Sequence, residues 1–346
     1  MSILSVIIPL YNGKTYIKDT ILSIEEANKD IQFELIIVDD GSTDDGLSVV
    51  QALSKQYPNI IVLTKENGGI ASAREFGLQN CKSKYVAFCD QDDRLLVGYS
   101  AFINKIEQQQ ADILMANNYV YLDGKLNKKN FFHEERVYNN TECKDLAKML
   151  FCPEVFTPKN ASRQHLMVLP GTIWNCIFKI DFIRNNNIHF QSNVHYEDDW
   201  LFIGQTVGES NCMIIVPDAF YCWTINPKSE SHTQRFISNF FQRRKQHKAL
   251  LMSITKHFGA KDDEQKLFEH ILDAQTIIVG GKNAMLLPYH DYLKEIKQLE
   301  VFSPLEQYKD FKTSKLSTLF LFLWSWRFHR FAYFLSKIIR LIKSRR

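Results

Sequence analysis

The sequence predicts an α/β fold: a mostly parallel sheet with helices on both faces, followed by a helical C-terminal region. Over the first hundred residues, short apolar runs typical of buried parallel strands alternate with helically spaced segments. Acidic clusters directly follow two of these runs, and parallel sheets bind ligands beyond the carboxyl ends of their strands. From residue 238 onward the apolar spacing is mostly helical.

The first elements alternate in type along the chain. Each strand candidate is a short β-branched or aromatic run that stops at a turn signal, and each helix candidate repeats apolar residues every three or four positions. The expected strands are 5–10, 33–38, 60–63 and 85–89. The expected helices are 15–26, 44–55 and 70–79. This βαβαβαβ order predicts an open sheet, because parallel strands need crossover connections.

The middle of the chain is less regular. Residues 125–135 are charged and predict a loop. A second loop is expected over 155–167, which contains Pro158 and several polar residues. Residues 211–224 predict one or two strands.

Composition and charge exclude several classes of protein. Among 346 residues, 45% are hydrophobic and 23% are charged, which excludes a disordered chain and a small disulfide scaffold. Residues 311–346 hold nine Lys and Arg and no acid, which leaves 33 basic against 39 acidic residues in 1–310. An acidic body of this kind is not suited to binding nucleic acid.

The cysteines and the ends of the chain predict a cytoplasmic location. Seven cysteines without a C-x-x-C pair indicate buried thiols in a reducing compartment rather than a zinc site. The N-terminus has no basic segment before its apolar run, so a signal peptide is not expected. No run of about 18 apolar residues predicts a membrane-spanning helix.

The basic tail predicts contact with a membrane surface. Residues 319–326 (LFLFLWSW) are almost entirely apolar, and the segment after them places apolar residues on one helical face and Lys and Arg on the other. A basic amphipathic helix rich in Trp and Phe is typical of an interfacial anchor. We therefore expect 315–346 to hold the protein on the inner face of the cell membrane. The alternative is a helix that packs on the body or forms a homo-oligomer interface.

The acidic clusters point to a divalent cation. The first turn, PLYNG (9–13), lacks both the G-x-G-x-x-G and the P-loop patterns. Asp90-x-Asp92 follows an apolar strand instead. Because carboxylates repel phosphate unless a cation lies between them, this pattern favours Mg²⁺ or Mn²⁺. Taken alone, each acidic cluster also suits a solvated turn or a helix cap.

Four ordered blocks resemble the family 2 glycosyltransferases, which have the GT-A fold. The blocks are SVIIPLYNG (5–13), FELIIVDDGSTDD (33–45), ENGGIASAREFG (66–77) and YVAFCDQDD (85–93). The resemblance continues more loosely through 173–190 and 195–202, and it covers about 1–230. In this family an Asp-x-Asp motif binds the metal and the nucleotide-sugar.

The resemblance implies a set of nucleotide contacts. Pro9, Tyr11 and Asp40 resemble the wall that holds the base, with Asp40 accepting a hydrogen bond from the base or ribose. Arg74 resembles a contact to the base or phosphate, with a surface helix residue as the alternative. Asp90 resembles the residue that contacts the ribose or the metal's waters.

The resemblance also implies a metal ligand set. Asp92 is the expected metal ligand of the Asp-x-Asp pair, with Asp90 and Asp93 assisting. His232 lies where some relatives place a residue that closes on the diphosphate, so it is a further candidate. The alternative for His232 is a loop histidine with no role.

The acceptor side is implied by a second acidic cluster. Inverting members use a carboxylate of a Glu-Asp pair as catalytic base, which falls on Asp198. Because Glu197-Asp198-Asp199 is a triple acid, Asp199 is the alternative. Trp174 is expected to line the acceptor pocket or to belong to the core.

These expectations combine into one function. A GT-A domain is expected over 1–235, with a nucleotide-sugar half (1–99) and an acceptor half (100–235), followed by a helical region (236–310) and the tail (311–346). The expected activity is metal-dependent, inverting hexosyl or N-acetylhexosaminyl transfer from a nucleotide-sugar, with UDP favoured, to a cell-surface glycan on a lipid carrier. The alternatives are a protein acceptor and a non-catalytic membrane-bound scaffold.

Overall fold

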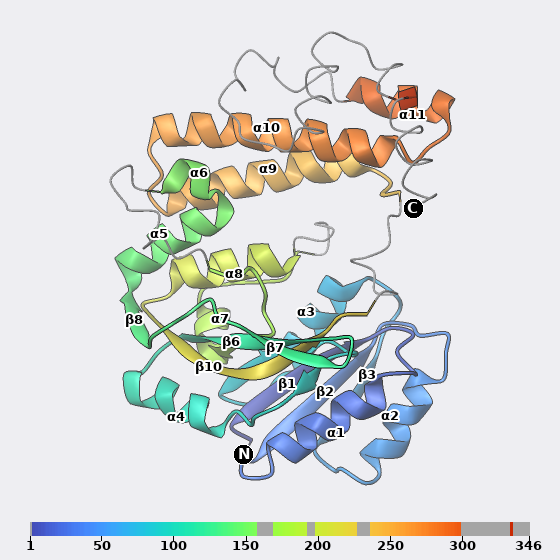
Figure 1. The fold of residues 1–346 in the computed structure, drawn as a ribbon, viewed down its shortest axis with the longest axis vertical. Coiled ribbons are helices and arrows are strands. Elements are labelled where there is room, and N and C mark those ends of the chain that lie inside the picture. The colour runs from blue at the N-terminus through green and yellow to red at the C-terminus, as the bar shows by residue number, and fades with distance from the viewer. Residues whose placement is uncertain (1, 158–168, 192–197, 227–235, 299–332, 335–346) are drawn as a thin grey trace. The chain divides into compact units, whose positions relative to one another are not determined.

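The computed structural model describes residues 2–157, 169–191, 198–226, 236–298 and 333–334 (Figure 1). The chain divides into two compact units, Met1–Lys228 and Ser229–Arg346, and each is described by itself. The boundaries expected at 235 and 310 stay predictions.

The described part of the first unit contains one ten-stranded sheet. Its strands are Leu4–Leu10 (β1), Phe33–Asp39 (β2), Ile60–Thr64 (β3), Tyr85–Phe88 (β4), Arg94–Leu95 (β5), Ile113–Leu122 (β6), Lys125–Lys129 (β7), Arg136–Asn139 (β8), Cys176–Lys179 (β9) and Cys212–Thr224 (β10). The order across the sheet is β3-β2-β1-β4-β9-β6-β10-β5, with β7 paired to β6 and β8 to β10.

Strand direction divides the sheet into two halves. The four strands β3, β2, β1 and β4 are all parallel, as the βαβ pattern predicts. Strand β9 runs antiparallel to both β4 and β6, whereas β6 and β10 are parallel to each other. The predicted α/β class is confirmed: a sheet whose first four strands are parallel, with helices on both faces, followed by a C-terminal region that is helical over its described residues.

Helices cover both faces of this sheet (Figure 1). Their bounds are Ile17–Ala27 (α1), Gly46–Ser54 (α2), Ile70–Asn80 (α3), Ser100–Gln109 (α4), Asn140–Phe151 (α5), Pro153–Phe156 (α6), Ile180–Asn185 (α7) and Asp198–Glu209 (α8). Apolar residues of α1, α2 and α4 share one core cluster with the alternate positions Val6 and Ile8 of β1. On the opposite face, Phe202 of α8 packs on Phe88 of β4 and Phe178 of β9.

Gly77 allows α3 to approach the sheet closely. A Cβ atom at this position would lie 2.6 Å from Ile7 Cγ2 and 3.3 Å from Val38 Cγ2, which are closer than normal carbon contacts. Because α3 also carries Arg74, this contact fixes the position of a residue that belongs to the site.

The loop predicted over 125–135 is wrong in its first half, because β7 is a strand. Asp123 and Gly124 have φ values of 49° and 76° and form the turn that joins β6 to β7. Both residues tolerate this left-handed backbone, and an Asp-Gly turn matches the twist of a two-stranded hairpin. Pairing with β6 therefore forms a strand from residues that are all exposed and mostly charged or polar.

The second unit is helical over its described residues. Its helices are Phe240–His257 (α9), Asp262–Ala284 (α10) and Tyr289–Lys297 (α11). Helices α9 and α10 are antiparallel, since Thr255 contacts Gln265 at one end and Lys248 contacts Asp273 further along. The helical prediction from residue 238 is confirmed over these described helices.

The predicted burial of the thiols holds for most of the cysteines. All seven cysteines are free, and all except the partly buried Cys212 are buried. Within the described residues, no helix is long and apolar enough to cross a membrane. The tail proposed to contact a membrane lies outside the described residues, apart from Tyr333 and Phe334.

Candidate active site

The site lies at the carboxyl ends of β1, β2 and β4, where the loops PLYNG, DDGS and DQDD meet. Gln91, between the two aspartates, joins the first loop to the third. Its Oε1 accepts from the Tyr11 amide at 2.9 Å, and its Nε2 donates to the Tyr11 carbonyl at 3.0 Å. The Tyr11 ring remains 48% exposed and is available to a ligand, whereas Pro9 is buried within β1.

Asp40 is buried and organises the loop that leads into α3. Its Oδ1 accepts from Lys65 Nζ at 2.6 Å and from the Gly68 amide at 3.0 Å. Its Oδ2 accepts from the amide of Gly69, whose φ of 85° precedes the first turn of α3. The predicted contact from Asp40 to a base or ribose is untested, but the structure assigns this carboxylate a role in the loop.

Replacing Asp40 with alanine is expected to lower the free energy of unfolding by about 1–3 kcal/mol, because a charged acceptor of several hydrogen bonds is lost. Chemical denaturation measures this change. Asp45→Ala is the matched control, since its ion pair with Lys14 joins side chains that are 69% and 54% exposed. That change is expected to leave the free energy of unfolding nearly unchanged, and equal losses in the two variants would contradict the role of Asp40.

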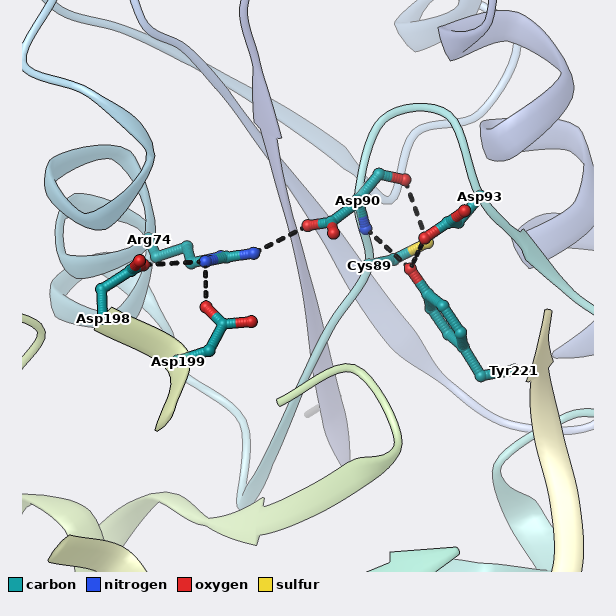
Figure 2. A network of polar contacts seen from close by, with 7 residues as sticks. All are labelled: Arg74, Cys89, Asp90, Asp93, Asp198, Asp199 and Tyr221. Atoms are coloured by element: carbon teal, nitrogen blue, oxygen red, sulfur yellow. Dashed lines mark hydrogen bonds and ion pairs between the residues drawn. The ribbon is translucent and has the colours of Figure 1, made fainter. Parts of the chain in front are cut away.

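Arg74 gathers three carboxylates from distant parts of the chain (Figure 2). Its Nη2 lies 2.8 Å from Asp90 Oδ1, and its Nη1 lies 2.9 Å from Asp198 Oδ2 and also contacts Asp199 Oδ1. The guanidinium is only 3% exposed. The end of β4 and the first turn of α8 are therefore joined through one cation from α3.

Burial and charge perturb the groups of this cluster. Burial lowers the pKa of Arg74, but attraction by Asp199, then by Asp90 and Asp198, outweighs it and raises the pKa overall. Burial raises the pKa of Asp199 to about 7, against the opposing charge of Arg74 and with support from the charge of Asp198. A carboxylate with such a pKa is poised to exchange a proton near neutrality.

The acidic loop 90–93 holds two further carboxylates with different surroundings. Asp93 is buried; its Oδ2 accepts from the Tyr221 hydroxyl at 2.6 Å and its Oδ1 from the Thr224 amide at 2.7 Å. Asp92 is half-buried, and its Oδ2 accepts from Asn226 Nδ2 at 3.2 Å. Burial, and next the charge of Asp90, raises the pKa of Asp92.

Asp92 fits a divalent cation, although the described residues hold no group of three His, Cys, Asp or Glu side chains that could bind one by themselves. Mg²⁺ and Mn²⁺ need only one or two carboxylates when phosphate and water supply the other oxygens. Burial and Asp90 disfavour the charged form of Asp92, and a cation would offset both. Asp93 has both oxygens bonded within the protein, so this geometry lends no support to its predicted assistance.

Trp174 is predicted for the acceptor pocket or the core, and His232 for the metal site. The Trp174 ring is 91% buried and stacks on Tyr221, with centroids 4.6 Å apart and planes 14° apart. This environment favours the core alternative for Trp174 and places it beside the acidic loop. His232 lies outside the described residues.

Sequence reasoning missed several residues that build the site. They are Gln91, Lys65, Asn226 and Tyr221, each of which hydrogen-bonds to one of the predicted loops. Gln91 could have been suspected from its place between Asp90 and Asp92. Nothing in the local sequence of Tyr221 marks a partner 131 residues earlier.

Comparison with known proteins identifies relatives for most of the chain. Residues 5–157 match the family model described as "Glycosyl transferase family 2". The minor teichoic acid biosynthesis protein GgaB of Bacillus subtilis (strain 168) is 26% identical over 246 residues, which are 68% of this chain and 24% of GgaB. Glycosyltransferase GlyA of Streptococcus pneumoniae serotype 4 is 33% identical over 145 residues, 40% of this chain and 20% of GlyA. The matched regions thus span about a quarter or less of these two relatives.

Solved structures share the fold. S. aureus TarS 1-349 in complex with UDP-GlcNAc has a TM-score of 0.64 to this chain at 17% identity, over 99% of this chain and 92% of that one. The same protein in complex with UDP has a TM-score of 0.62 with the same coverage.

Proposed function

We propose that this chain, whose residues 5–157 match glycosyltransferase family 2, moves a sugar from a UDP-sugar to a hydroxyl of a cell-surface glycan, with a divalent cation and with inversion. The observation that carries the proposal is the Arg74 cluster. It brings Asp90, from the loop expected to meet the donor, into one ion-pair network with Asp198 and Asp199. A carboxylate suited to accept a proton therefore lies beside the donor loop.

The comparisons support the classes of donor and acceptor. TarS, which shares the fold, has been solved with UDP and with UDP-GlcNAc, which favours a uridine diphosphate sugar here. The name of GgaB refers to teichoic acid, a surface polymer, which favours a surface glycan over a protein acceptor. A lipid-linked form of that glycan would agree with a basic tail over 315–346 on the inner membrane face.

In the proposed reaction, the base removes the proton of the acceptor hydroxyl, whose oxygen then bonds to the anomeric carbon of the sugar. The bond from that carbon to the diphosphate oxygen breaks on the opposite face, so the configuration inverts in one displacement. A cation held at Asp92, with Asp90 beside it, would neutralise the departing diphosphate. Arg74 keeps the base and the donor loop in fixed relation.

Two features support Asp199, the alternative in the triple acid, over Asp198 as the base. The Asp199 side chain is 23% exposed, against 8% for Asp198, so an acceptor can reach it more readily. Its pKa of about 7 also suits proton transfer near neutrality.

Replacing Asp92 with alanine tests the donor site. We expect loss of Mn²⁺-dependent UDP binding and of sugar transfer, because the cation loses its principal protein ligand. Differential scanning fluorimetry with UDP, GDP, CDP and TDP, each with and without Mn²⁺, measures binding through the melting temperature. Asp218→Ala, at an exposed position of β10, is the control. A retained Mn²⁺-dependent shift in the Asp92 variant would exclude this residue from the metal site.

A further inference from the structure

Tyr221 lies where strand β10 meets the acidic loop (Figure 2). Its hydroxyl donates to Asp93 Oδ2 at 2.6 Å and accepts from the Asp90 amide at 3.1 Å. The side chain is fully buried, and Asp93 is only 1% exposed. One phenol oxygen therefore holds both ends of the loop that carries Asp92.

Residues at the end of β10 and just after it reinforce this attachment. The Thr224 amide donates to Asp93 Oδ1 at 2.7 Å, and Asn226 Nδ2 donates to Asp92 Oδ2 at 3.2 Å. Directly after the loop, Leu95 of β5 pairs antiparallel with Tyr221. The end of β10 and the residues just after it thus contact three of the four residues of the acidic loop, Asp90, Asp92 and Asp93.

The ring of Tyr221 carries a second contact. It lies nearly parallel to the indole of Trp174, with centroids 4.6 Å apart. Trp174 precedes β9, so the ring links the segment before β9 to the acidic loop. Ring and hydroxyl are chemically separable, because phenylalanine retains the stacking and lacks the hydrogen bonds.

We propose that Tyr221 is a positioning residue for sugar transfer: its hydroxyl fixes the Asp90 backbone and the Asp93 carboxylate, and thereby sets the position of Asp92, which would hold the divalent cation. The inference rests on the proposed function, since it concerns the loop assigned to the donor. In this assignment Tyr221 touches no substrate and acts through the loop alone.

Tyr221→Phe is the test, with UDP and Mn²⁺ as the probes. We expect the Kd for UDP in saturating Mn²⁺ to rise about tenfold, which is the scale of a lost buried hydrogen bond to a charged group. The Mn²⁺ concentration needed for half-maximal binding is expected to rise as well, whereas UDP binding without metal is expected to stay unchanged. A purely structural role would lower the melting temperature without this metal-dependent difference.

Tyr99→Phe is the matched control. Tyr99 is fully buried and packs on Phe220, next to Tyr221, but its hydroxyl has no hydrogen-bond partner in the described part of the chain. Removing that hydroxyl is expected to leave UDP and Mn²⁺ binding unchanged. Asp93→Asn provides a second variant, and combining it with Tyr221→Phe is expected to weaken binding by less than the sum of the two single changes, because both remove the contact between the Tyr221 hydroxyl and Asp93.

The outcomes separate this inference from the proposed function. If the unmodified protein shows no Mn²⁺-dependent binding of UDP, the proposed function fails in its donor and metal assignment, and the inference fails with it. If the unmodified protein binds and Tyr221→Phe binds equally well, only the positioning role is overturned. Equal weakening by Tyr99→Phe, or fully additive losses in the double variant, would also overturn it.

Discussion

Replacing Arg74 with methionine is expected to lower the free energy of unfolding by about 3–5 kcal/mol near pH 8. The change retains most of the buried volume but leaves Asp90, Asp198 and Asp199 without their common cation. Removing one partner of a buried ion pair is costly because the remaining charge is neither hydrated nor compensated. Denaturant unfolding at a series of pH values measures the effect.

The pH dependence of this loss has a defined sign. Asp199 already has a folded-state pKa of about 7, above its ordinary value of 3.8, and losing Arg74 raises it further. A raised folded-state pKa gives stability that is complete below the unfolded-state pKa and is lost as the pH rises through the folded-state value. We therefore expect the difference between variant and unmodified protein to grow as the pH rises through about 7, because the unmodified protein then releases the Asp199 proton while the variant still holds it.

Arg94→Met is the control for this experiment. Arg94 pairs with Asp19 at 3.1 Å, but the two side chains are 55% and 64% exposed. Its loss is expected to change stability by no more than about 0.5 kcal/mol at any of these pH values. A small, pH-independent loss in Arg74→Met would contradict the buried cluster.

The parallel half of the sheet could be predicted because each of its strands carries a strong local signal. Strands β1 and β2 are short, mostly apolar runs that end at turn residues. Both are buried at every position, as such runs predict. Strand β7 carries no such signal. All its residues are exposed, and its pairing with β6 follows from the Asp123-Gly124 turn rather than from hydrophobic pattern.

In the candidate site, too, local sequence patterns predict some residues, whereas contacts between distant segments of the chain are not predicted. The sequence places Asp40, Asp90 and Asp92 at strand ends, because strand and turn patterns are local. It does not indicate that Arg74 would meet Asp198, 124 residues later, since that contact depends on how α3 and α8 pack. Nor can local spacing decide between Asp198 and Asp199, because that choice depends on exposure and surrounding charge.

Asp199→Asn is expected to reduce kcat for sugar transfer by about 10²–10⁴-fold, the usual contribution of a general base. Asparagine retains the shape and can still occupy the site beside Arg74, but it cannot accept the acceptor's proton. In the unmodified protein, the base is active when deprotonated and has a pKa of about 7. For the unmodified protein we therefore expect kcat/KM to rise about tenfold per pH unit below 7 and to level off above it. This rising limb of the pH profile is expected to disappear in the variant.

Asp198→Asn distinguishes the two carboxylates of the first turn of α8. Because the charge of Asp198 raises the pKa of Asp199, its removal is expected to move the midpoint of the pH limb downward and to lower kcat less than tenfold. UDP and Mn²⁺ binding should persist in both variants, since neither residue is assigned to the metal. If Asp198→Asn abolishes the limb and Asp199→Asn only displaces it, Asp198 is the base. The raised pKa of Asp199 would then reflect its burial and the neighbouring charges of Asp198 and Asp90 rather than a catalytic role.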